Sequence, residues 1–468
     1  MLELSEKIGA VLWSPIMLII LMGSSVILTF RFKFFQITQI KKIYKETIYS
    51  LFSKKLKNKS KSKKKEITPF EAVSAALAGT MGVGNIAGVA TAITAGGAGA
   101  IFWMWISAFF CMIIKYIEVI LSQLYKQKKP GGFVGGPMYY ISNGLKSRGL
   151  AVVFSVFCII SSFGIGNMSQ ANTISNALKN TFEIPGIITG IFVSIITAVI
   201  IIGGVKRIVS FTSKFIPLAS VIYILAAVIV IICNSQNTVG ALKLIITDAF
   251  EIKQAGAGIL GFIMSKSVRF GISRGIFSNE AGLGSAPIAH AVSSPETSVQ
   301  QGMWGIFEVF FDTIIVCTLT ALAILTSNVH KIAGLDGINL TNEAFSSVFG
   351  NISGVFLSVS IIFFAVATLI SWSFYGECCI TYLFEKSKIY KIIYKFIFIG
   401  LIIVGSVINA EIVWSLSDIF NALMALPNIA AVIILSPQVY KETKKYLNTR
   451  GLERFERVLG ETFLKSFP

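Results

Sequence analysis

The sequence predicts an all-α membrane protein with about eleven transmembrane helices. Hydrophobic residues make up 54% of the 468 positions and charged residues only 14%. Polar side chains are therefore too few to cover the surface of a water-soluble fold. Apolar stretches of roughly 20 residues, the length that a helix needs to cross hydrocarbon, recur along nearly the whole chain. We expect one membrane domain whose solvent is the bilayer.

The apolar stretches are separated by short loops, apart from one long polar loop after the first stretch and a polar tail at the end. The first stretch is too long for a cleaved signal peptide and lacks a basic leader, so we expect it to remain as a helix. The predicted spans are 10–30, 70–95, 99–124, 151–177, 183–203, 209–233, 254–276, 300–326, 351–376, 389–407 and 412–436.

Lysine and arginine are unevenly distributed between the two sides of this arrangement. Segment 31–66 holds thirteen basic residues, and placing it inside the cell puts the N-terminus outside and the C-terminus in the cytoplasm. The inner segments are 31–66, 122–150, 204–214, 266–298, 377–395 and 438–468. They hold thirty-five of the 41 basic residues and the outer segments hold five, as the positive-inside rule requires. The chain is therefore predicted to be a multi-pass protein of the plasma membrane, with its tail 438–468 on the cytosolic surface.

The net charge of +18 and the lysine run within 54–65 raise the question of a nucleic-acid partner. A polybasic stretch beside a membrane helix more often faces anionic lipid of the inner leaflet, so we expect lipid there and no nucleic acid. The six cysteines lack metal-ligand spacing and imply neither disulfides nor zinc. Only His290 and His330 are available for acid–base chemistry, so we expect neither an enzyme nor a cofactor.

The second span begins as a regular helix and then changes character. Thr68 and Glu71 form a capping box with proline at the first helical position. Segment 79–88 follows and places four glycines and two hydrogen-bonding side chains at membrane depth. This composition favours local unwinding. Unwound backbone there must be buried in protein or line a polar cavity, because unpaired amides are costly in lipid.

Two other interpretations of this segment are possible. Gly84 and Gly88 form a GxxxG pair, which is a common device for close helix packing in membranes. Residues 82–87 also match a nucleotide-binding fingerprint. We reject the second interpretation because the match interrupts an apolar helix and does not follow a strand.

A second irregular stretch, 277–287, follows the seventh span and is again small and polar. Glycine-interrupted segments in corresponding positions of two halves indicate a transporter site at a repeat interface. Spans two to six and seven to eleven make two sets of five, and the odd number per set gives them opposite orientations. The sequence thus predicts an inverted repeat with the parts 1–66, 67–253, 254–437 and 438–468.

At these residues the chain resembles the alanine or glycine:cation symporter family, also called sodium:alanine symporters, of the amino acid–polyamine–organocation superfamily. The resemblance rests on GVGNIAGVATAI at 82–93, GAIFWMW at 99–105, GGPMYY at 135–140 and FSNEAGLGSAPIAHA at 277–291. It implies the LeuT-type five-plus-five fold and transport of a small amino acid such as alanine or glycine with sodium. Met81 and Ala98 depart from the family pattern, and Met81 is expected to alter the size of the pocket.

A zwitterionic substrate needs separate partners for its two ends, and a broken helix offers both from its backbone. An amide-rich patch in the fourth span can bind the substrate or join neighbouring helices. The resemblance implies that Phe277 is a pocket wall and that Glu280 is a gate or a helix cap. Trp372 is a lid or floor of the pocket, or an ordinary packing residue. The predicted substrate-binding residues are Gly79, Thr80, Gly82, Gly84, Asn85, Gln170, Asn172, Phe277, Ser278, Asn279 and Trp372.

Sodium prefers oxygen ligands, which hydroxyl groups and freed carbonyls supply. Thr368 and Ser371 share one face of the ninth span at i, i+3 spacing. In the related fold, one sodium lies between the helices that correspond here to spans two and nine. The predicted sodium ligands are therefore Gly79, Gly82, Thr368 and Ser371. The alternative is that both hydroxyl groups bond to their own helix.

Glu308 and Asp312 lie one turn apart in the eighth span, where buried carboxylates suggest cation steering or proton coupling. Together these features predict a secondary active symporter that carries alanine or glycine into the cell with sodium by alternating access. The alternatives are a proton-coupled amino acid transporter of the same fold and an ion channel. A channel would call for a pore-lining ring or filter, which two broken helices do not provide.

Overall fold

The computed structural model describes residues 15–52, 66–129, 132–250, 266–332, 334–335, 337–385, 387–408 and 410–465. Within these ranges, seven helices are long and apolar enough to cross a membrane, and three shorter apolar helices accompany them. The prediction of an all-α, multi-pass membrane protein is confirmed. The seven helices are Gly99–Leu124, Arg148–Phe182, Gly204–Cys233, Ser298–Thr326, Ile352–Leu383, Lys388–Val407 and Ile419–Thr449.

The described residues are mostly helical, with one short β hairpin between α9 and α10. The first elements are α2 (Pro15–Arg31), α3 (Phe35–Thr38), α4 (Ile40–Glu46), α5 (Ile48–Phe52), α7 (Pro69–Thr80), η1 (Val83–Asn85), α8 (Ala87–Gly96), α9 (Gly99–Leu124), β1 (Gln127–Lys129), β2 (Gly132–Val134), α10 (Pro137–Asn143), α11 (Arg148–Phe163), η2 (Gly164–Met168), α12 (Ser169–Phe182), α13 (Gly186–Ile202), α14 (Gly204–Cys233), η3 (Ser235–Asn237) and α15 (Thr238–Ala249).

The remaining elements follow the gap at 251–265, which contains the predicted start of the seventh span. They are α17 (Lys266–Asn279), α18 (Ala286–His290), α19 (Ser298–Val309), η4 (Phe310–Cys317), α20 (Thr318–Thr326), η5 (Val329–Lys331), α21 (Gly337–Phe349), α22 (Ile352–Leu383), α23 (Lys388–Val407) and α24 (Ala410–Lys465). Two of the stretches labelled η, η2 and η4, are π-helical turns within longer helices.

The start of α7 forms as the sequence indicates. The Glu71 amide donates to the Thr68 hydroxyl at 3.2 Å, and the Thr68 amide donates to the Glu71 carboxylate at 2.8 Å. This capping box satisfies backbone donors that would otherwise be unpaired at the helix end. The predicted role of Glu71 as a cap is confirmed.

Several connections that were expected to be loops contain short helices. Helices α3, α4 and α5 occupy the first part of the basic segment 31–66, while most of its lysine run lies outside the described residues. Helix α10 follows the β hairpin, and α15 and α21 follow α14 and α20. None of the three is longer than 13 residues, which is too short to register as a span.

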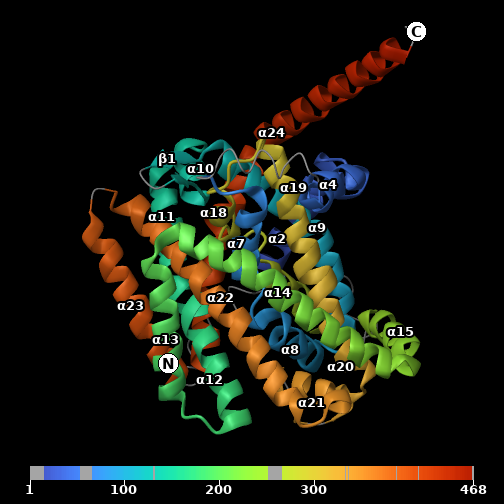
Figure 1. Cartoon of the computed structure of the whole chain (residues 1–468), viewed down its shortest axis with the longest axis vertical. Helices are drawn as coiled ribbons and strands as arrows, with labels where there is room; N and C mark the ends of the chain where they lie inside the picture. The colour runs from blue at the N-terminus through green and yellow to red at the C-terminus, as the bar shows by residue number, and fades with distance from the viewer. Residues whose placement is uncertain are drawn as a thin grey trace.

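The two broken helices meet inside the bundle. Helices α7 and α8 lie one after the other near its middle (Figure 1). Helix α17 packs against α8 and α9, and α18 packs against α7. Helices α14 and α22 also pack against α7. The first half of each broken helix therefore contacts the second half of the other.

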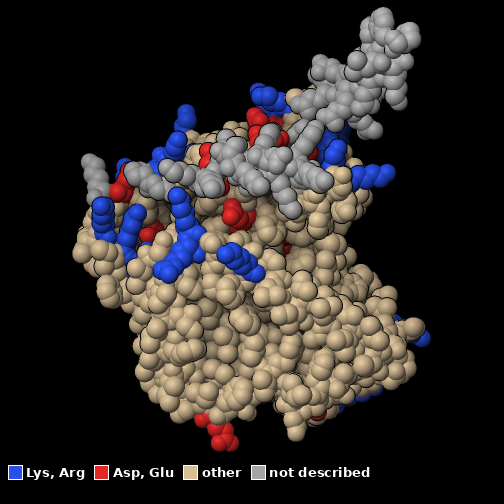
Figure 2. All heavy atoms as spheres, viewed as in Figure 1, with Lys and Arg blue, Asp and Glu red and all other residues tan. Residues whose placement is uncertain are grey.

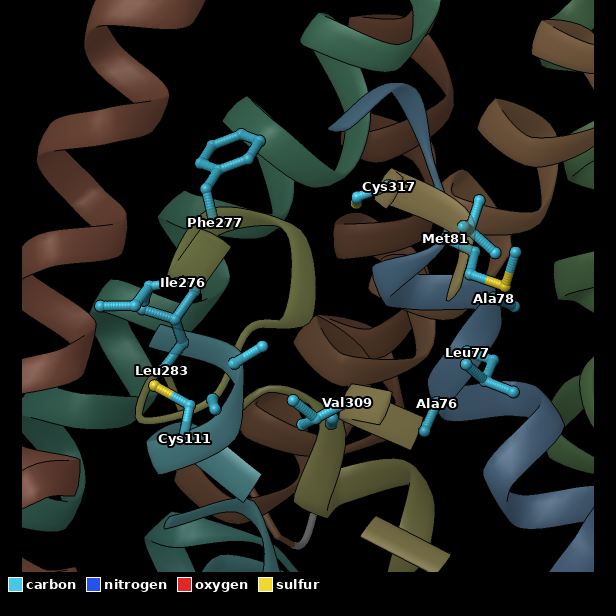
Figure 3. Packing of buried hydrophobic residues seen from close by; sticks show 14 of the residues in the cluster. Ala76, Leu77, Ala78, Met81, Cys111, Ile276, Phe277, Leu283, Val309 and Cys317 are labelled. Atoms are coloured by element: carbon cyan, nitrogen blue, oxygen red, sulfur yellow. The ribbon is translucent and has the colours of Figure 1, made fainter. Parts of the chain in front are cut away.

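Small and apolar side chains fill the space around these breaks. Ala72, Ala76 and Ala78 on α7 are completely buried. Figure 3 shows Ala76, Ala78 and Met81 at the end of α7, with Phe277 and Leu283 on α17 and the turn after it. Alanine at this density lets neighbouring helices approach closely.

On the face that Figure 2 shows, charged side chains gather at the end of the bundle where α24 leaves it, and the broad middle carries few charges. This distribution suits a body immersed in hydrocarbon.

One prediction from the sequence is wrong, namely the placement of Lys266 with the inner segments. The Lys266 carbonyl lies 3.2 Å from where a Cβ on Gly96 would stand, beside α15 at the opposite end of the bundle from α10 (Figure 1).

Candidate substrate and cation site

The first broken helix unwinds between α7 and α8, as the glycine content predicts. Helix α7 ends at Thr80, and Gly82 has an extended backbone with φ −134° and ψ −148°. The Gly82 amide donates to the Asn85 side-chain oxygen at 3.1 Å, so one freed backbone group is satisfied locally. The alternative of tight packing through Gly88 is wrong, because a Cβ placed there would meet nothing within 4 Å.

The second broken helix turns between α17 and α18. Three residues of this turn, Glu280, Gly282 and Gly284, have left-handed backbones with φ of 53°, 88° and 83°. Glycine adopts this conformation at little cost, whereas glutamate does so only where its surroundings hold it. The Asn279 side chain accepts from the Ala281 amide at 3.0 Å and so fixes the start of the turn.

A small pocket lies between the two breaks. Seven of the residues predicted to bind substrate line it, together with Thr368 from the predicted sodium site. Glu280 also lines it, as do Val83 and Ile165, which were not predicted from the sequence. The full lining consists of Gly79, Thr80, Gly82, Val83, Gly84, Ile165, Gln170, Phe277, Glu280, Thr368 and Trp372.

A π turn aims Gln170 at this pocket. The turn η2 interrupts the regular hydrogen bonds between α11 and α12, and the Gln170 amide nitrogen donates to the Ile165 carbonyl at 3.1 Å. The Gln170 oxygen is buried and has no hydrogen-bond partner among the described residues. It lies 3.4 Å from where a Cβ on Gly82 would stand. The pocket thus contains an acceptor that is free to bind a donor.

Trp372 and Glu280 form the opposite wall. The Trp372 indole donates to one Glu280 carboxylate oxygen at 3.1 Å, and the Ser285 hydroxyl donates to the other at 2.5 Å. Gly166 in the π turn makes room for the indole, since a Cβ there would overlap the Trp372 side chain. Both Trp372 and Glu280 are buried. Trp372 lines the pocket, which favours the interpretation as its lid or floor over that of an ordinary packing residue.

Asn85, Ser278 and Asn279 are near the pocket but do not line it. Asn85 and Ser278 instead donate to the two carboxylate oxygens of Asp312, each at 2.7 Å. The Thr313 hydroxyl donates to the same carboxylate at 2.9 Å and accepts from the Asn279 side chain at 3.2 Å. A single buried carboxylate therefore joins both breaks to η4.

Asn172 lies elsewhere. Its amide nitrogen donates to the carbonyls of Gly405 at 3.1 Å and Ile408 at 2.7 Å, at the end of α23. The structure therefore favours its alternative role as a contact between helices.

Met81 also faces away from the pocket, with the Ser220 hydroxyl of α14 3.6 Å from its sulfur. The structure thus gives no support to the expectation that Met81 changes the pocket's size.

The structure brings Thr368 and Ser371 to the unwound end of α7. The Thr368 hydroxyl is within hydrogen-bonding distance of the Ala78 carbonyl at 2.9 Å and of Phe364 in its own helix at 3.0 Å. The Ser371 hydroxyl donates to the Ala75 carbonyl at 2.9 Å. The predicted approach of the two helices is found, but their direct carbonyl partners are Ala78 and Ala75. Gly82 still lies close, with a Cβ position 2.9 Å from the Thr368 hydroxyl.

Residues 1–457 match the profile that describes the sodium:alanine symporter family. The chain belongs to the sodium:alanine symporter family. It is 36% identical to the sodium/alanine symporter AgcS of Methanococcus maripaludis over 96% of this chain and 98% of that one. It is 38% identical to the probable sodium/glutamine symporter GlnT of Bacillus subtilis over 93% and 88% of the two chains. An uncharacterized transporter of Haemophilus influenzae is 38% identical over 97% of both. Members of the family are transporters, as the sequence predicts.

Solved structures support the fold at a greater distance. A mutant of the Eremococcus coleocola manganese transporter aligns with a TM-score of 0.52 over 78% of each chain, at 12% sequence identity. At this identity the likeness concerns the fold alone and says nothing about the transported substrate. The chain therefore has the helical architecture of a membrane transporter.

Proposed function

We propose that this protein is a secondary active symporter that carries a small neutral amino acid, alanine or glycine, into the cell together with sodium by alternating access. The observation that carries the proposal is the pocket between two broken helices, lined by freed backbone and by one unpartnered side-chain acceptor. Family membership supports cation-coupled amino acid transport. Phe277, Ile165 and Trp372 surround the pocket and favour a small side chain over a large one.

The two ends of the amino acid find different partners in this pocket. The free oxygen of Gln170 and the carboxylate of Glu280 suit the ammonium group. The backbone of Val83 and Gly84 supplies amide donors for the carboxylate, and Gly82, whose own amide is bound to Asn85, borders the pocket beside them. We place Gly79 and Thr80 at the substrate's side as well. Asn85, Ser278 and Asn279 support the pocket through Asp312 and do not touch the substrate in this arrangement.

Sodium is assigned to the space between α7 and α22. Thr368 and Ser371 provide hydroxyl oxygens, and the end of α7 provides carbonyls, including those near Gly79 and Gly82. An ion there would replace the present hydrogen bonds to Ala78 and Ala75, because the hydroxyl groups would turn their lone pairs toward it. Ion binding and the order of the unwound segment are coupled in this way.

We further propose that the fold is the LeuT-type inverted repeat, with spans two to six and seven to eleven as its halves. Pairs of contacts related by exchange of the halves support it. Helix α7 packs on α18 as α17 packs on α8, and α11 packs on α24 as α22 packs on α14. The short helices α10 and α21 also occupy matching places before α11 and α22. The boundaries at 66, 253 and 437 remain predictions.

The orientation follows from charge. The basic end of the bundle, where α24 leaves it, is proposed to face the cytosol and the anionic lipid of the inner leaflet (Figure 2). The N-terminus is then extracellular and the C-terminus cytoplasmic, in a multi-pass protein of the plasma membrane.

Uptake into proteoliposomes tests the proposal. Purified protein is reconstituted, and uptake of labelled alanine, glycine and glutamine is measured under an inward sodium gradient, an inward proton gradient, or neither. Sodium-driven uptake of alanine or glycine supports the proposal. Uptake driven only by protons would retain the pocket and reject the ion site, in favour of the proton-coupled alternative. Conductance without saturation would point to a channel.

Variants of the hydroxyl groups sharpen the sodium assignment. Ser371→Ala is expected to raise the sodium concentration for half-maximal uptake, because it removes one ligand oxygen. Ser373→Ala is the matched control, since the Ser373 hydroxyl donates to the Ile370 carbonyl of its own helix at 2.8 Å. Equal sodium dependence in both variants would remove Ser371 from the site.

A further inference from the structure

A second group of buried ionisable side chains lies outside the pocket. It joins His290 on α18, Glu308 on α19 and Lys115 on α9, all three with fully buried side chains. His290 Nε2 and a Glu308 carboxylate oxygen are 2.8 Å apart, and the Lys115 nitrogen lies 3.5 Å from the other oxygen. Charges at this depth are costly unless paired, so the group is a candidate functional element.

The other ring nitrogen of His290 faces a side chain that can either donate or accept. The Gln301 amide nitrogen is 2.8 Å from His290 Nδ1, which makes Nδ1 an acceptor and leaves the imidazole proton on Nε2. The Gln301 oxygen is buried and has no partner among the described residues. A half-turn of this amide would present that oxygen to Nδ1 and allow a second proton on the ring. The surroundings of His290 therefore satisfy both its neutral and its charged form.

Negative groups outnumber positive ones around this cluster. Glu118 on α9 and Glu280 in the break lie close enough to Lys115 to interact with its charge. Tyr375 on α22 lies near Glu280 and Glu308, and the carboxylate of Asp312 on η4 lies near Glu308. Helix α7, which also packs against α18, carries Glu71 in its first turn, where the carboxylate is bound to Thr68. One lysine thus faces three buried carboxylates, and an added proton would offset part of this excess.

His290, on α18, places this cluster beside the segment that follows the second break. The Pro287 carbonyl accepts from the Ser122 hydroxyl at 2.7 Å, and the His290 carbonyl accepts from the Gln123 side chain. Lys126 donates to the Ser293 carbonyl at 2.7 Å just beyond it. Two side chains of α19 contact His290 of α18, Glu308 at one ring nitrogen and Gln301 at the other.

We propose that His290 and Glu308, flanked by Lys115 and Gln301, form a proton-binding site separate from the amino-acid pocket, whose occupancy strengthens the attachment of α18 to α19. A neutral imidazole donates a hydrogen bond to the Glu308 carboxylate. An imidazolium adds the attraction between two opposite charges, which water does not screen at a buried site, so the contact becomes stronger. Proton binding therefore stabilises the arrangement in which α18 is held, and it opposes movements that would detach it.

The proton itself is observed by nuclear magnetic resonance of labelled histidine in the full chain, reconstituted in lipid nanodiscs. The sequence has only two histidines, so His330→Gln leaves a single signal. Partial burial and the neighbouring Lys331 lower the pKa of His330, and its removal avoids any overlap. The chemical shift of the His290 signal is expected to change with pH as the ring gains its second proton.

Neighbouring charges should move this titration in opposite directions. Glu308→Gln removes a negative partner and should shift the midpoint to lower pH by about one unit or more. Lys115→Met removes a positive neighbour and should shift it to higher pH, while Lys115→Arg should leave it near its original position. The proton site would be overturned if the His290 signal does not titrate. It would also be overturned if the midpoint in Glu308→Gln and in Lys115→Met is the same as in the unmodified protein.

The consequence for movement is measured by sodium-driven alanine uptake with equal pH on both sides of the vesicle. This part rests on the proposed function, whereas the resonance titration does not. At saturating alanine, the turnover rate should fall as pH decreases from 8 to 5.5, and in His290→Gln it should stay constant. A decline that persists in His290→Gln, or no decline in the unmodified protein, would overturn the role of the proton in holding α18.

Discussion

The two broken helices differ in how their irregular backbone is held. Between α7 and α8, the Gly82 amide is satisfied by Asn85, and the remaining groups of the turn border the pocket. Between α17 and α18, side chains from other helices hold the turn: Asn428 donates to the Gly282 carbonyl at 2.8 Å, and Trp372 donates to Glu280 at 3.1 Å. The first break thus offers backbone to a ligand, and the second is a fixed wall that offers a side chain.

The largest effect is expected at the first break. A Cβ on Gly82 would lie 2.9 Å from the Thr368 hydroxyl and 3.4 Å from the Gln170 oxygen. Gly82→Ala should therefore lower alanine uptake by about 100-fold, since small displacements of positioning groups have effects of that order. Gly88→Ala, where a Cβ meets nothing within 4 Å, should retain near-normal uptake in the same vesicles. Similar uptake by both variants would contradict a pocket at Gly82.

Substitution in the second break should affect stability first. Gly284 has φ +83°, and a Cβ there would lie 2.6 Å from the Pro137 ring. Gly284→Ala should destabilise the protein by about 3 kcal/mol from combined strain and overlap. Gly334→Ala is the control. Gly334 has φ +82°, so a side chain there is strained in the same way, but a Cβ would meet nothing within 4 Å. The melting temperature in detergent distinguishes them, and equal losses would show that the turn is not tightly packed.

Asp312 connects the two breaks, so its neutralisation tests whether they act together. Asp312→Asn replaces one acceptor by a donor opposite Asn85 or Ser278, both of which donate to the carboxylate at 2.7 Å. We expect the alanine concentration for half-maximal uptake to rise about tenfold, because a hydrogen bond to a charged group is lost. Asp248→Asn is the control: its carboxylate accepts from the Gly99 amide at 2.7 Å, outside the pocket lining. Unchanged transport in Asp312→Asn would mean that the breaks are independent.

The smallest expected effects separate Gln170 from Asn172. Gln170→Ala should raise the alanine concentration for half-maximal uptake about five- to tenfold, the value of one hydrogen bond, with little loss of stability. Asn172→Ala should leave that concentration unchanged and lower the melting temperature, because the carbonyls of Gly405 and Ile408 lose their donor. The reverse pattern would place Asn172 in the pocket and Gln170 in the helix interface.

The breaks could be predicted from the sequence because glycine and polar residues seldom gather within an apolar span unless its helix is interrupted there. The face shared by Thr368 and Ser371 could also be predicted, since it follows from helical periodicity alone. Their carbonyl partners could not, because the level at which one helix meets another depends on the packing of the whole bundle. The same holds for Gln170 and Asn172, which lie on different faces of one helix.

Several features give no pattern that a single sequence reveals. The short helices α10, α15 and α21 are too brief to stand out from loops by periodicity. Glu280 lies in the motif at 277–291, where the sequence leaves it as a gate or a helix cap. The choice depends on what surrounds its carboxylate, and its partner Trp372 is distant in the sequence. The side on which Lys266 lies could not be predicted because the start of α17 depends on where the break falls.

The π turn η2 makes the pocket sensitive to the number of residues in a helix as well as to their identity. A π turn contains one residue more than the α-helix that would otherwise cover the same length. Deleting one residue from Gly164–Met168 would restore a regular helix and leave α12 nearly in place, because the wide turn absorbs the extra residue locally. The Gln170 amide bonds to the Ile165 carbonyl, five residues earlier across this turn, at 3.1 Å. The deletion would disturb that bond, so the length of the turn determines how firmly the side chain that faces the substrate is held.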